Sequence, residues 1–380
     1  MSTLKTTNLQ HASAASPAIV LASDGTATAQ LSSLNGGALS GARNRIINGD
    51  MRIDQRNAGA SVTPADDAYT LDRWNVGLTQ SSKFSVQQST TAPTGFANSL
   101  LVTSLSAYTV GSGDLFRVTH KIEGFNFSDL GWGAAGAQSV TLSFWVRSSL
   151  TGTFGGSLQN NAFNRSYPFS YAISAANTWE YKTVTISGDT TGTWVGSTNG
   201  IGLRLNFSLG TGSSSSGTAG AWASSGLVST TGATSVVGTN GATFYITGVQ
   251  LEAGSVATPF ERRSYGQELA LCQRYYFKSK ADGSNAYLSN FGSTVDAVSA
   301  RFSTALPVEM RANPTVGYSN VGIDRHTAAY SITGLAIFGS LAKNVVALSA
   351  TGASGMTANQ PVVLYSNSTS TGFIDYSAEL

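Results

Sequence analysis

Hydrophobic and polar residues alternate with a period of two along much of the chain from Ile46 onward. The clearest run is 201–207, in which isoleucine, two leucines and phenylalanine alternate with glycine, arginine and asparagine. The runs 116–123, 140–147 and 183–186 follow the same rule, and glycine-rich turn signals separate them. Strands with one apolar and one polar face are typical of antiparallel sheets that pack as a sandwich. The pattern therefore predicts an all-β protein whose main domain is a jelly-roll β-sandwich.

The segment 244–251 has apolar residues on both of its faces, and this predicts an inner strand of the sandwich. A stretch rich in serine, glycine and threonine, 208–241, precedes it, with Trp222 near its middle. A loop of this length in a domain is functional or mobile, and an indole within it favours an anchor. The residues do not tell whether Trp222 anchors on its own domain or on a neighbour.

One helix is predicted, over about 264–274. Ser264 and Gln267 have the spacing of a capping box, and Leu269 and Cys272 follow at near-helical spacing. The β pattern then resumes and predicts a second, distal domain that resembles a β-sandwich. Its expected strands are 295–302, 314–318, 330–338, 343–350 and 361–365.

Residues 1–43 contain no aromatic side chain and consist mostly of small residues. They have too little apolar area to offset the entropy lost on ordering, so they cannot fold alone. We expect an extended arm that orders against a partner or against copies of itself, with a flexible tail as the alternative. The chain thus divides into this arm, a jelly-roll domain at 44–262, and a C-terminal β-domain at 263–380 that begins with the helix.

Composition excludes several classes of function. The net charge is +2 without a basic run, so no nucleic-acid partner is expected. No apolar stretch reaches the 18 residues or more of a membrane span, so no membrane insertion is expected. Cys272 is the single cysteine, which excludes an internal disulfide framework and a cysteine zinc site.

Catalytic and metal motifs are missing from the sequence. The three histidines, His11, His120 and His326, do not have metal-ligand spacing, and no nucleophile elbow or phosphate-binding loop is present. We expect His120 to be a hydrogen-bonded core or edge residue. Asp66 and Asp67 lie in a turn, where aspartate commonly caps the backbone. We therefore predict no enzyme activity, no metal site and no cofactor, although a structural calcium ion at this turn stays an open alternative.

Aromatic residues give the stronger functional signal, because sugars present flat C–H faces that stack on exposed rings. Trp145 and Arg147 occupy the polar face of one predicted strand, and Arg204 and Asn206 occupy the polar face of another. If the two strands are neighbours, the four side chains form a groove that can stack on a glycan and hydrogen-bond to it. The alternative is that Trp145 fills the core, as aromatic residues in strands usually do.

Several motifs in a fixed order resemble those of bacteriophage tail fibres and related virion proteins. NRIINGDMRIDQR at 44–56 and YTLDRW at 69–74 resemble the opening of a module of that family. FYITGVQLEAG at 244–254 and TPFER at 258–262 resemble its close. The remaining matches are LCQRYY at 271–276, LPVEMRANPT at 306–315, and an N-terminal run similar to particle-proximal arms of cyanobacterial phages.

The resemblance implies a carbohydrate-binding-module-like jelly roll, a homotrimer, and a distal C-terminal domain that meets the host. The expected function is that of a non-catalytic tail fibre subunit that attaches the virion to host surface polysaccharide. It would be made in the host cytoplasm, located on the virion, and joined to other virion proteins through residues 1–43. A head fibre, cement or other decoration protein of the virion is the alternative. A glycan depolymerase would be favoured by short β-helix repeats, which the sequence lacks.

Overall fold

The computed structural model describes residues 42–339, 344–352 and 354–380, together with 8–9, 19–21, 23 and 27–29. Near the N-terminus, β1 (Asn8–Leu9), β2 (Ile19–Leu21) and β3 (Ala27–Ala29) form a small antiparallel sheet. Most of the predicted arm, 1–43, lies outside the described residues.

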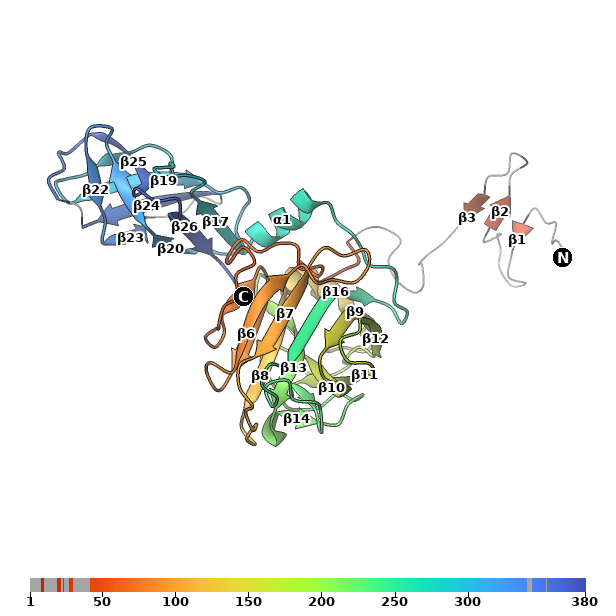
Figure 1. Ribbon diagram of the computed structural model, residues 1–380. Helices are drawn as coiled ribbons and strands as arrows, with labels where there is room; N and C mark the ends of the chain where they lie inside the picture. Colours follow the sequence, from red (N-terminus) through yellow and green to blue (C-terminus); the bar gives the residue numbers. More distant parts are fainter. Residues whose placement is uncertain are drawn as a thin grey trace.

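The main domain is a β-sandwich of two antiparallel sheets (Figure 1). The six-stranded sheet has the order β11-β10-β13-β8-β5-β4, and the five-stranded sheet has the order β12-β9-β16-β7-β6. The first half of the domain supplies β4 (Tyr69–Leu71), β5 (Trp74–Leu78), β6 (Phe84–Ser89), β7 (Ser99–Ser104), β8 (Leu115–Glu123) and β9 (Val140–Ser148). The second half supplies β10 (Gly152–Gln159), β11 (Ser166–Ile173), β12 (Glu180–Ile186), β13 (Ile201–Thr211) and β16 (Thr243–Ala253). Because the chain crosses repeatedly between the sheets, as in a jelly roll, the predicted all-β fold is confirmed.

The core lies between the two sheets, and the alternation of each strand decides which side chains enter it. Phe144 on β9 and Phe207 on β13 are fully buried and meet with ring centroids 5.1 Å apart. β16 lies between β9 and β7, so 244–251 is the inner strand that its two apolar faces predict. Since Phe144 points inward, its neighbour Trp145 points outward from the sandwich.

Trp222 anchors its long loop on the sandwich itself. Its indole nitrogen donates to the backbone oxygen of Ser187 at 2.9 Å, and its ring meets those of Trp132 and Trp194 edge to face. The loop contains η3 (Ser213–Ser215), β14 (Ser216–Gly217) and β15 (Ser229–Thr230), and two further 3-10 turns, η1 (Gly124–Asn126) and η2 (Ser128–Leu130), follow β8. An edge-to-face cluster of three indoles explains how a loop of small residues is held in place.

Asn44 ties the start of the sandwich domain to its last strand. Its amide nitrogen donates to the backbone oxygen of Val249, and its amide oxygen accepts from the backbone of Leu251, both at 3.1 Å. Glu261 in turn accepts the backbone N–H of Asn44 at 2.7 Å. The motifs at the two ends of the domain therefore meet in space and close it.

The single α-helix of the described residues, α1 (Tyr265–Gln273), connects the sandwich to the C-terminal domain. Ser264 caps it and accepts the backbone N–H of Gln267 at 3.4 Å, which confirms the predicted helix. Cys272 on this helix is fully buried and packs in a small cluster with residues of the sandwich domain. No helix in the described part of the chain is long and apolar enough to cross a membrane.

The C-terminal domain has its own hydrophobic core and two sheets. One has the order β17-β26-β20 and the other β22-β21-β25-β18-β19-β24-β23. The strands are β17 (Tyr276–Lys280), β18 (Gly292–Thr294), β19 (Ser299–Ala305), β20 (Thr315–Ser319), β21 (Val321–Asp324), β22 (Ala329–Ser331), β23 (Gly334–Ile337), β24 (Val345–Thr351), β25 (Pro361–Ser366) and β26 (Phe373–Ser377). The pattern of the sequence did not indicate β26, although it is the central strand of its sheet.

Candidate functional site

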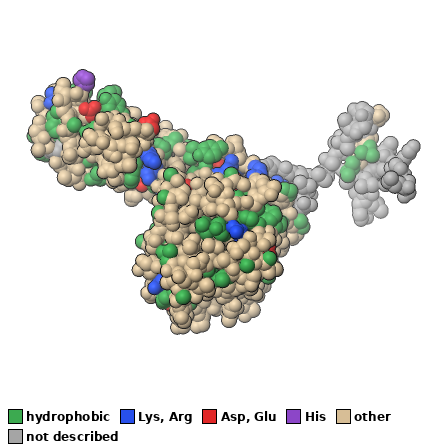
Figure 2. All heavy atoms as spheres, in the orientation of Figure 1, with side chains coloured by type: hydrophobic (Ala, Val, Ile, Leu, Met, Phe, Trp, Pro, Cys, Tyr) green, Lys and Arg blue, Asp and Glu red, His purple; other side chains and the backbone are tan. Residues whose placement is uncertain are grey.

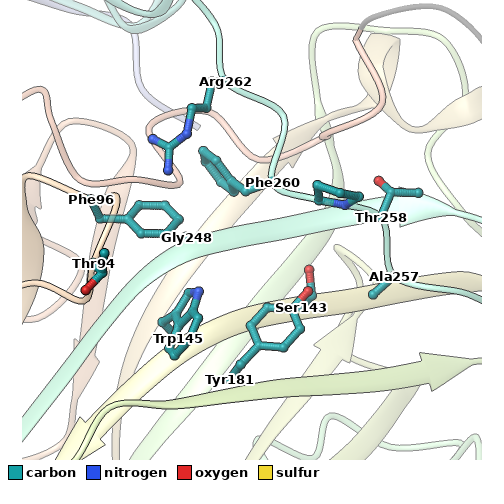
Figure 3. Close-up of a pocket in the computed structure, with 11 residues that line it drawn as sticks. Thr94, Phe96, Ser143, Trp145, Tyr181, Gly248, Ala257, Thr258, Phe260 and Arg262 are labelled. Carbon is teal, nitrogen blue, oxygen red and sulfur yellow. The ribbon is translucent and has the colours of Figure 1, made fainter.

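A groove of about 650 Å³ lies on the outer face of the five-stranded sheet (Figure 3). β9, β12 and β16 supply its floor, and the loop before β7 and the segment after β16 supply its walls. Figure 2 shows hydrophobic side chains gathered on this face of the sandwich. We call it the aromatic groove, and its lining is Thr94, Phe96, Ser143, Trp145, Tyr181, Gly248, Ala257, Thr258, Pro259, Phe260 and Arg262.

Two aromatic rings form the floor of the aromatic groove. Trp145 on β9 and Tyr181 on β12 are direct cross-strand partners, and their ring centroids are 5.4 Å apart at an interplanar angle of 48°. Tyr181 is 44 % exposed and Trp145 is half-buried. Because such pairs on one face of a sheet pack against each other, the two rings form a continuous apolar platform.

Gly248 shapes the groove through a bulge in β16. The register between β16 and β9 shifts between Thr247 and Gln250, and Gly248 has a φ of +60°. A Cβ at this position would lie 2.7 Å from Cζ of Phe96 and 3.1 Å from Cδ1 of Trp145. Only glycine therefore combines this left-handed backbone with the close approach of the Phe96 ring.

Phe96, Phe260 and Arg262 form the opposite wall. The two phenylalanine rings meet edge to face with centroids 5.2 Å apart, and the Arg262 guanidinium lies 4.6 Å from the Phe96 centroid. Nη2 of Arg262 also donates to the backbone oxygen of Gly95 at 2.5 Å. Figure 3 shows both rings above the strands that carry the floor. The wall thus combines apolar surface with one positive charge at its rim.

The backbone of the wall is fixed by hydrogen bonds of buried polar residues. Glu252 accepts the backbone N–H of Thr258 at 2.8 Å and its hydroxyl at 2.7 Å. Gln250 accepts the backbone N–H of Glu261 at 2.7 Å. These bonds hold the segment 258–262 beside the sheet, so the groove is preformed.

The aromatic surface continues beyond the groove along the same sheet. Arg147 on β9 is the cross-strand partner of Tyr245 on β16, and its guanidinium lies 5.0 Å from the tyrosine centroid. Nε of Arg147 donates to the backbone oxygen of Asn177 at 2.8 Å, and Trp179 lies 6.0 Å from Tyr245. This face therefore offers several rings to an extended ligand.

The structure does not bring the four predicted site residues together. Trp145 lines the aromatic groove and Arg147 lies beside it, but Arg204 and Asn206 are on β13, in the other sheet. The condition for the predicted groove, that the two strands are neighbours, is not met, because β9 pairs with β12 and β16 while β13 pairs with β8 and β10. Alternation reveals which face of a strand a residue occupies, but it does not reveal which strand lies alongside.

Asn206 is fully buried, and its amide is hydrogen-bonded within its own sheet. Its amide oxygen accepts from the hydroxyl of Thr119 at 2.8 Å, and its amide nitrogen donates to Gln159 at 2.8 Å and to Ser157 at 3.1 Å. Arg204 is 8 % exposed and lies against the ring of Phe163.

Apart from Trp145, the residues that line the groove were not predicted as ligand contacts, and the aromatic or charged ones among them are Phe96, Tyr181, Phe260 and Arg262. Tyr181 stands two positions before Thr183, the first residue of the alternating run 183–186, so its outward position could have been read by extending that run. Phe260 and Arg262 belong to a motif that was noted for its resemblance and not for its position. Phe96 lies in a loop, and nothing local in the sequence indicates its place.

The other chemical candidates have local structural partners. Asp66 accepts the backbone N–H of Leu78 at 2.9 Å, and Asp67 pairs with Lys121 at 3.0 Å. Nε2 of His120 lies 3.2 Å from the backbone nitrogen of Ile47, and burial holds the pKa of this imidazole well below its usual value. Within the described residues, no group of three or more histidine, cysteine, aspartate or glutamate side chains could hold a metal ion.

Comparisons with known proteins give distant structural likenesses. No family model matches the sequence, and neither does any curated protein. Tailspike protein 4 of bacteriophage CBA120 matches 56 % of this chain and 21 % of its own, with 13 % identity and a TM-score of 0.32. A family 4 carbohydrate-binding module matches 55 % of this chain and 99 % of its own, with 12 % identity and a TM-score of 0.30.

A third likeness is to the family 11 carbohydrate-binding module of Clostridium thermocellum, solved with a mixed-linked tetrasaccharide. It covers 53 % of this chain and 100 % of its own, with 10 % identity and a TM-score of 0.26. The matched region spans about a fifth of the tailspike chain but nearly all of each binding module. At these scores the likenesses establish neither a family nor a ligand for this chain.

Proposed function

We propose that this protein is a non-catalytic tail fibre subunit of a bacteriophage, and that it binds a glycan of the host surface in the aromatic groove. The observation that carries the proposal is the pairing of a Trp145–Tyr181 floor with a Phe96–Phe260 wall across a preformed groove. The C–H faces of a sugar ring are apolar and flat, so they stack on such rings. Arg262 and the hydroxyl of Ser143 can hydrogen-bond to the sugar hydroxyls at the same time.

The composition of the groove supports binding without chemistry. Its lining contains no carboxylate, imidazole or thiol. Glycoside hydrolysis requires a pair of carboxyl groups on either side of the scissile bond. A glycan in this groove would therefore be held without being cleaved.

The assignment to a tail fibre is supported by the resemblance of the motifs at both ends of the sandwich domain. The protein would then act as a homotrimer on the virion surface and join other virion proteins through residues 1–43. The C-terminal domain would lie distal to the particle. A decoration protein of the capsid would have the same groove, so the position on the particle separates the two roles.

A glycan microarray of the full-length protein, followed by calorimetric titration of the strongest neutral oligosaccharide, tests the groove. Trp145→Ala and Tyr181→Ala should each weaken binding about tenfold, because each removes one stacking ring. Tyr265→Ala is the matched control, since Tyr265 is an exposed ring on α1 that is not part of the groove lining. Unchanged affinity in both groove variants would refute the proposed site.

Gold-labelled antibodies on intact particles, and competition of purified protein with phage adsorption, test the role. If the label lies at the tail and the purified protein reduces phage adsorption, the protein is a receptor-binding fibre. If the label lies on the capsid and the purified protein does not compete with phage adsorption, the protein is instead a decoration protein of the capsid.

A further inference from the structure

The outer face of the six-stranded sheet is polar across three neighbouring strands. The strand registers place these side chains side by side, although most of them are buried: Arg117 and Lys121 on β8, Arg204 and Asn206 on β13, and Ser157 and Gln159 on β10. This face lies on the side of the sandwich opposite to the aromatic groove, so it does not depend on the function proposed for that groove.

Two arginines of this face lie next to one glutamine in the sheet. Arg117 donates from Nη1 to the amide oxygen of Gln159 at 3.2 Å. Gln159 is the direct cross-strand partner of Arg204. Burial lowers the pKa of Arg117, and the nearby charge of Arg204 lowers it further.

Neither of these arginines forms an ion pair among the described residues, although the nearby carboxylates of Asp66 and Asp67 partly offset the lowering of the Arg117 pKa. The nearby Asp67 pairs with Lys121, and Arg204 donates only to the neutral amide of Asn161, at 3.1 Å. The Nε atoms of Arg117 and Arg204 are buried without a hydrogen-bond partner. Burial, and then the charge of Arg204, lower the pKa of Arg117 to about 10.

A buried charge without an ion-pair partner is costly, and two like charges near each other also repel. A bound oxyanion would remove both penalties at once, because a guanidinium offers a planar fork of N–H donors that matches a carboxylate or a sulfate. This pair of arginines therefore has the electrostatic character of an anion site.

An exposed aromatic ring stands beside this pair. Phe163 is 45 % exposed in the turn between β10 and β11, and its ring centroid lies 4.6 Å from the guanidinium carbon of Arg204. It has a φ of +55°, a left-handed conformation that is uncommon for a bulky residue. The strained turn thus presents an apolar ring to solvent next to a positive charge, as stacking on a sugar requires.

We propose that this face binds an acidic saccharide, with Arg117 and Arg204 holding its carboxylate or sulfate and Phe163 stacking on the sugar ring. The site is separate from the aromatic groove, so the protein has two glycan contacts on opposite sheets. Half-buried Arg117 and exposed Phe163 give the ligand access from solvent.

Calorimetric titration of the full-length protein with trigalacturonate, neutral galactotriose and sodium sulfate tests the site. Trigalacturonate should bind, sulfate should compete with it, and galactotriose should fail to displace it. Arg204→Gln and Arg117→Gln should each weaken trigalacturonate binding about tenfold or more, because each removes a charged hydrogen-bonding group. Trp145→Ala should leave this binding unchanged, and this separates the site from the aromatic groove.

Arg301→Gln is a matched control, because Arg301 also stacks on a phenylalanine, Phe338, but in the C-terminal domain. It should bind trigalacturonate like the wild type. Without ligand, Arg117→Gln should unfold at the same temperature as the wild type or higher, since it relieves repulsion. A purely structural role would instead lower the unfolding temperature.

Three results would overturn the proposal. They are the absence of trigalacturonate binding, binding that both arginine variants retain, and equal binding of galactotriose through the same residues. Binding of sulfate alone, lost in Arg204→Gln, would also overturn it, because the site would then take an inorganic anion and no saccharide.

Discussion

Arg73 and Glu379 lie 306 positions apart in the sequence and form an ion pair in which both side chains are buried. Arg73 precedes the strand β5 of the sandwich, and Glu379 follows the last strand of the C-terminal domain. Glu379 also accepts from Arg56 at 2.7 Å, and the Arg73 guanidinium lies 3.6 Å from the ring centroid of Tyr275. One carboxylate therefore compensates two arginines and fastens the two domains together.

We expect Glu379→Gln to destabilise the protein by about 3 kcal/mol or more, because it removes the ion-pair partner of the buried Arg73 and of the half-buried Arg56. Chemical denaturation of the full-length protein, together with limited proteolysis, measures the effect. Asp282→Asn is the control, since Asp282 is an exposed acid of the same domain, and its change should stay within about 0.5 kcal/mol. Equal effects of the two substitutions would show that the pair does not hold the domains.

Asp72 should give the protein a measurable pH dependence. Burial is the main cause that raises the pKa of this carboxyl to about 6, although Gln55 donates two hydrogen bonds to it. A raised pKa means that the native state binds the proton more tightly than the unfolded state does. The stabilising contribution of this group is therefore full below about pH 4 and is lost as the pH rises through about 6.

Asp72→Asn keeps the shape of the side chain without the charge. The free energy of unfolding of this variant, relative to that of the wild type, should rise by up to about 3 kcal/mol as the pH rises from 4 to 7.5. Urea denaturation of both proteins across this range measures the difference and cancels the effect of all other groups. A flat difference, or one of opposite sign, would mean that the carboxylate is ionised in the fold and stabilised by its donors.

The sequence was sufficient for the faces of individual strands but not for their neighbours. Local alternation put Phe144 and Trp145 on opposite faces of one strand, since side-chain direction depends only on the strand itself, but it left open which of the two faces the core. It could not show that Arg204 belongs to the opposite sheet, because strand order depends on how distant segments close the sandwich. Of the four residues predicted to form a groove, Trp145 lines the aromatic groove and Arg147 lies beside it, whereas Arg204 and Asn206 are in the other sheet.

The walls of the aromatic groove depend on contacts between distant segments, which local patterns do not indicate. They come from the loop around Phe96 and the segment around Phe260, and these are more than 160 residues apart in the sequence. Gly248 acquires its role only through a positive φ and a ring from another loop, and neither is visible in a one-dimensional pattern. By contrast, the helix after Ser264 depends on a cap within a few residues, so it was predictable.

The indole cluster around Trp222 should contribute to the stability of the sandwich. Trp222→Ala would remove edge-to-face contacts with Trp132, Trp194 and Tyr167, as well as the hydrogen bond to Ser187. We expect a loss of about 2 to 4 kcal/mol, because a large ring is removed from a packed site.

Thermal unfolding and protease cleavage within the loop 208–241 measure this effect. Trp222→Phe, which keeps a ring but loses the N–H donor, should lie between the wild type and the alanine variant. Loop cleavage at the wild-type rate in Trp222→Ala would show that the indole does not anchor the loop.

Gly248→Ala should damage the aromatic groove through a single added carbon. The methyl group would meet the rings of Phe96 and Trp145, so the wall must move away from the floor. The left-handed backbone at this position adds a stability cost of about 1 to 2 kcal/mol.

Gly241→Ala is the matched control, because Gly241 has a φ of +74° and nothing lies within 4 Å of its added carbon. Both variants should lose similar stability in denaturation experiments, but only Gly248→Ala should lose affinity for the oligosaccharide that binds the wild type. Equal affinities of the two variants would show that the Phe96 ring is not part of the glycan contact.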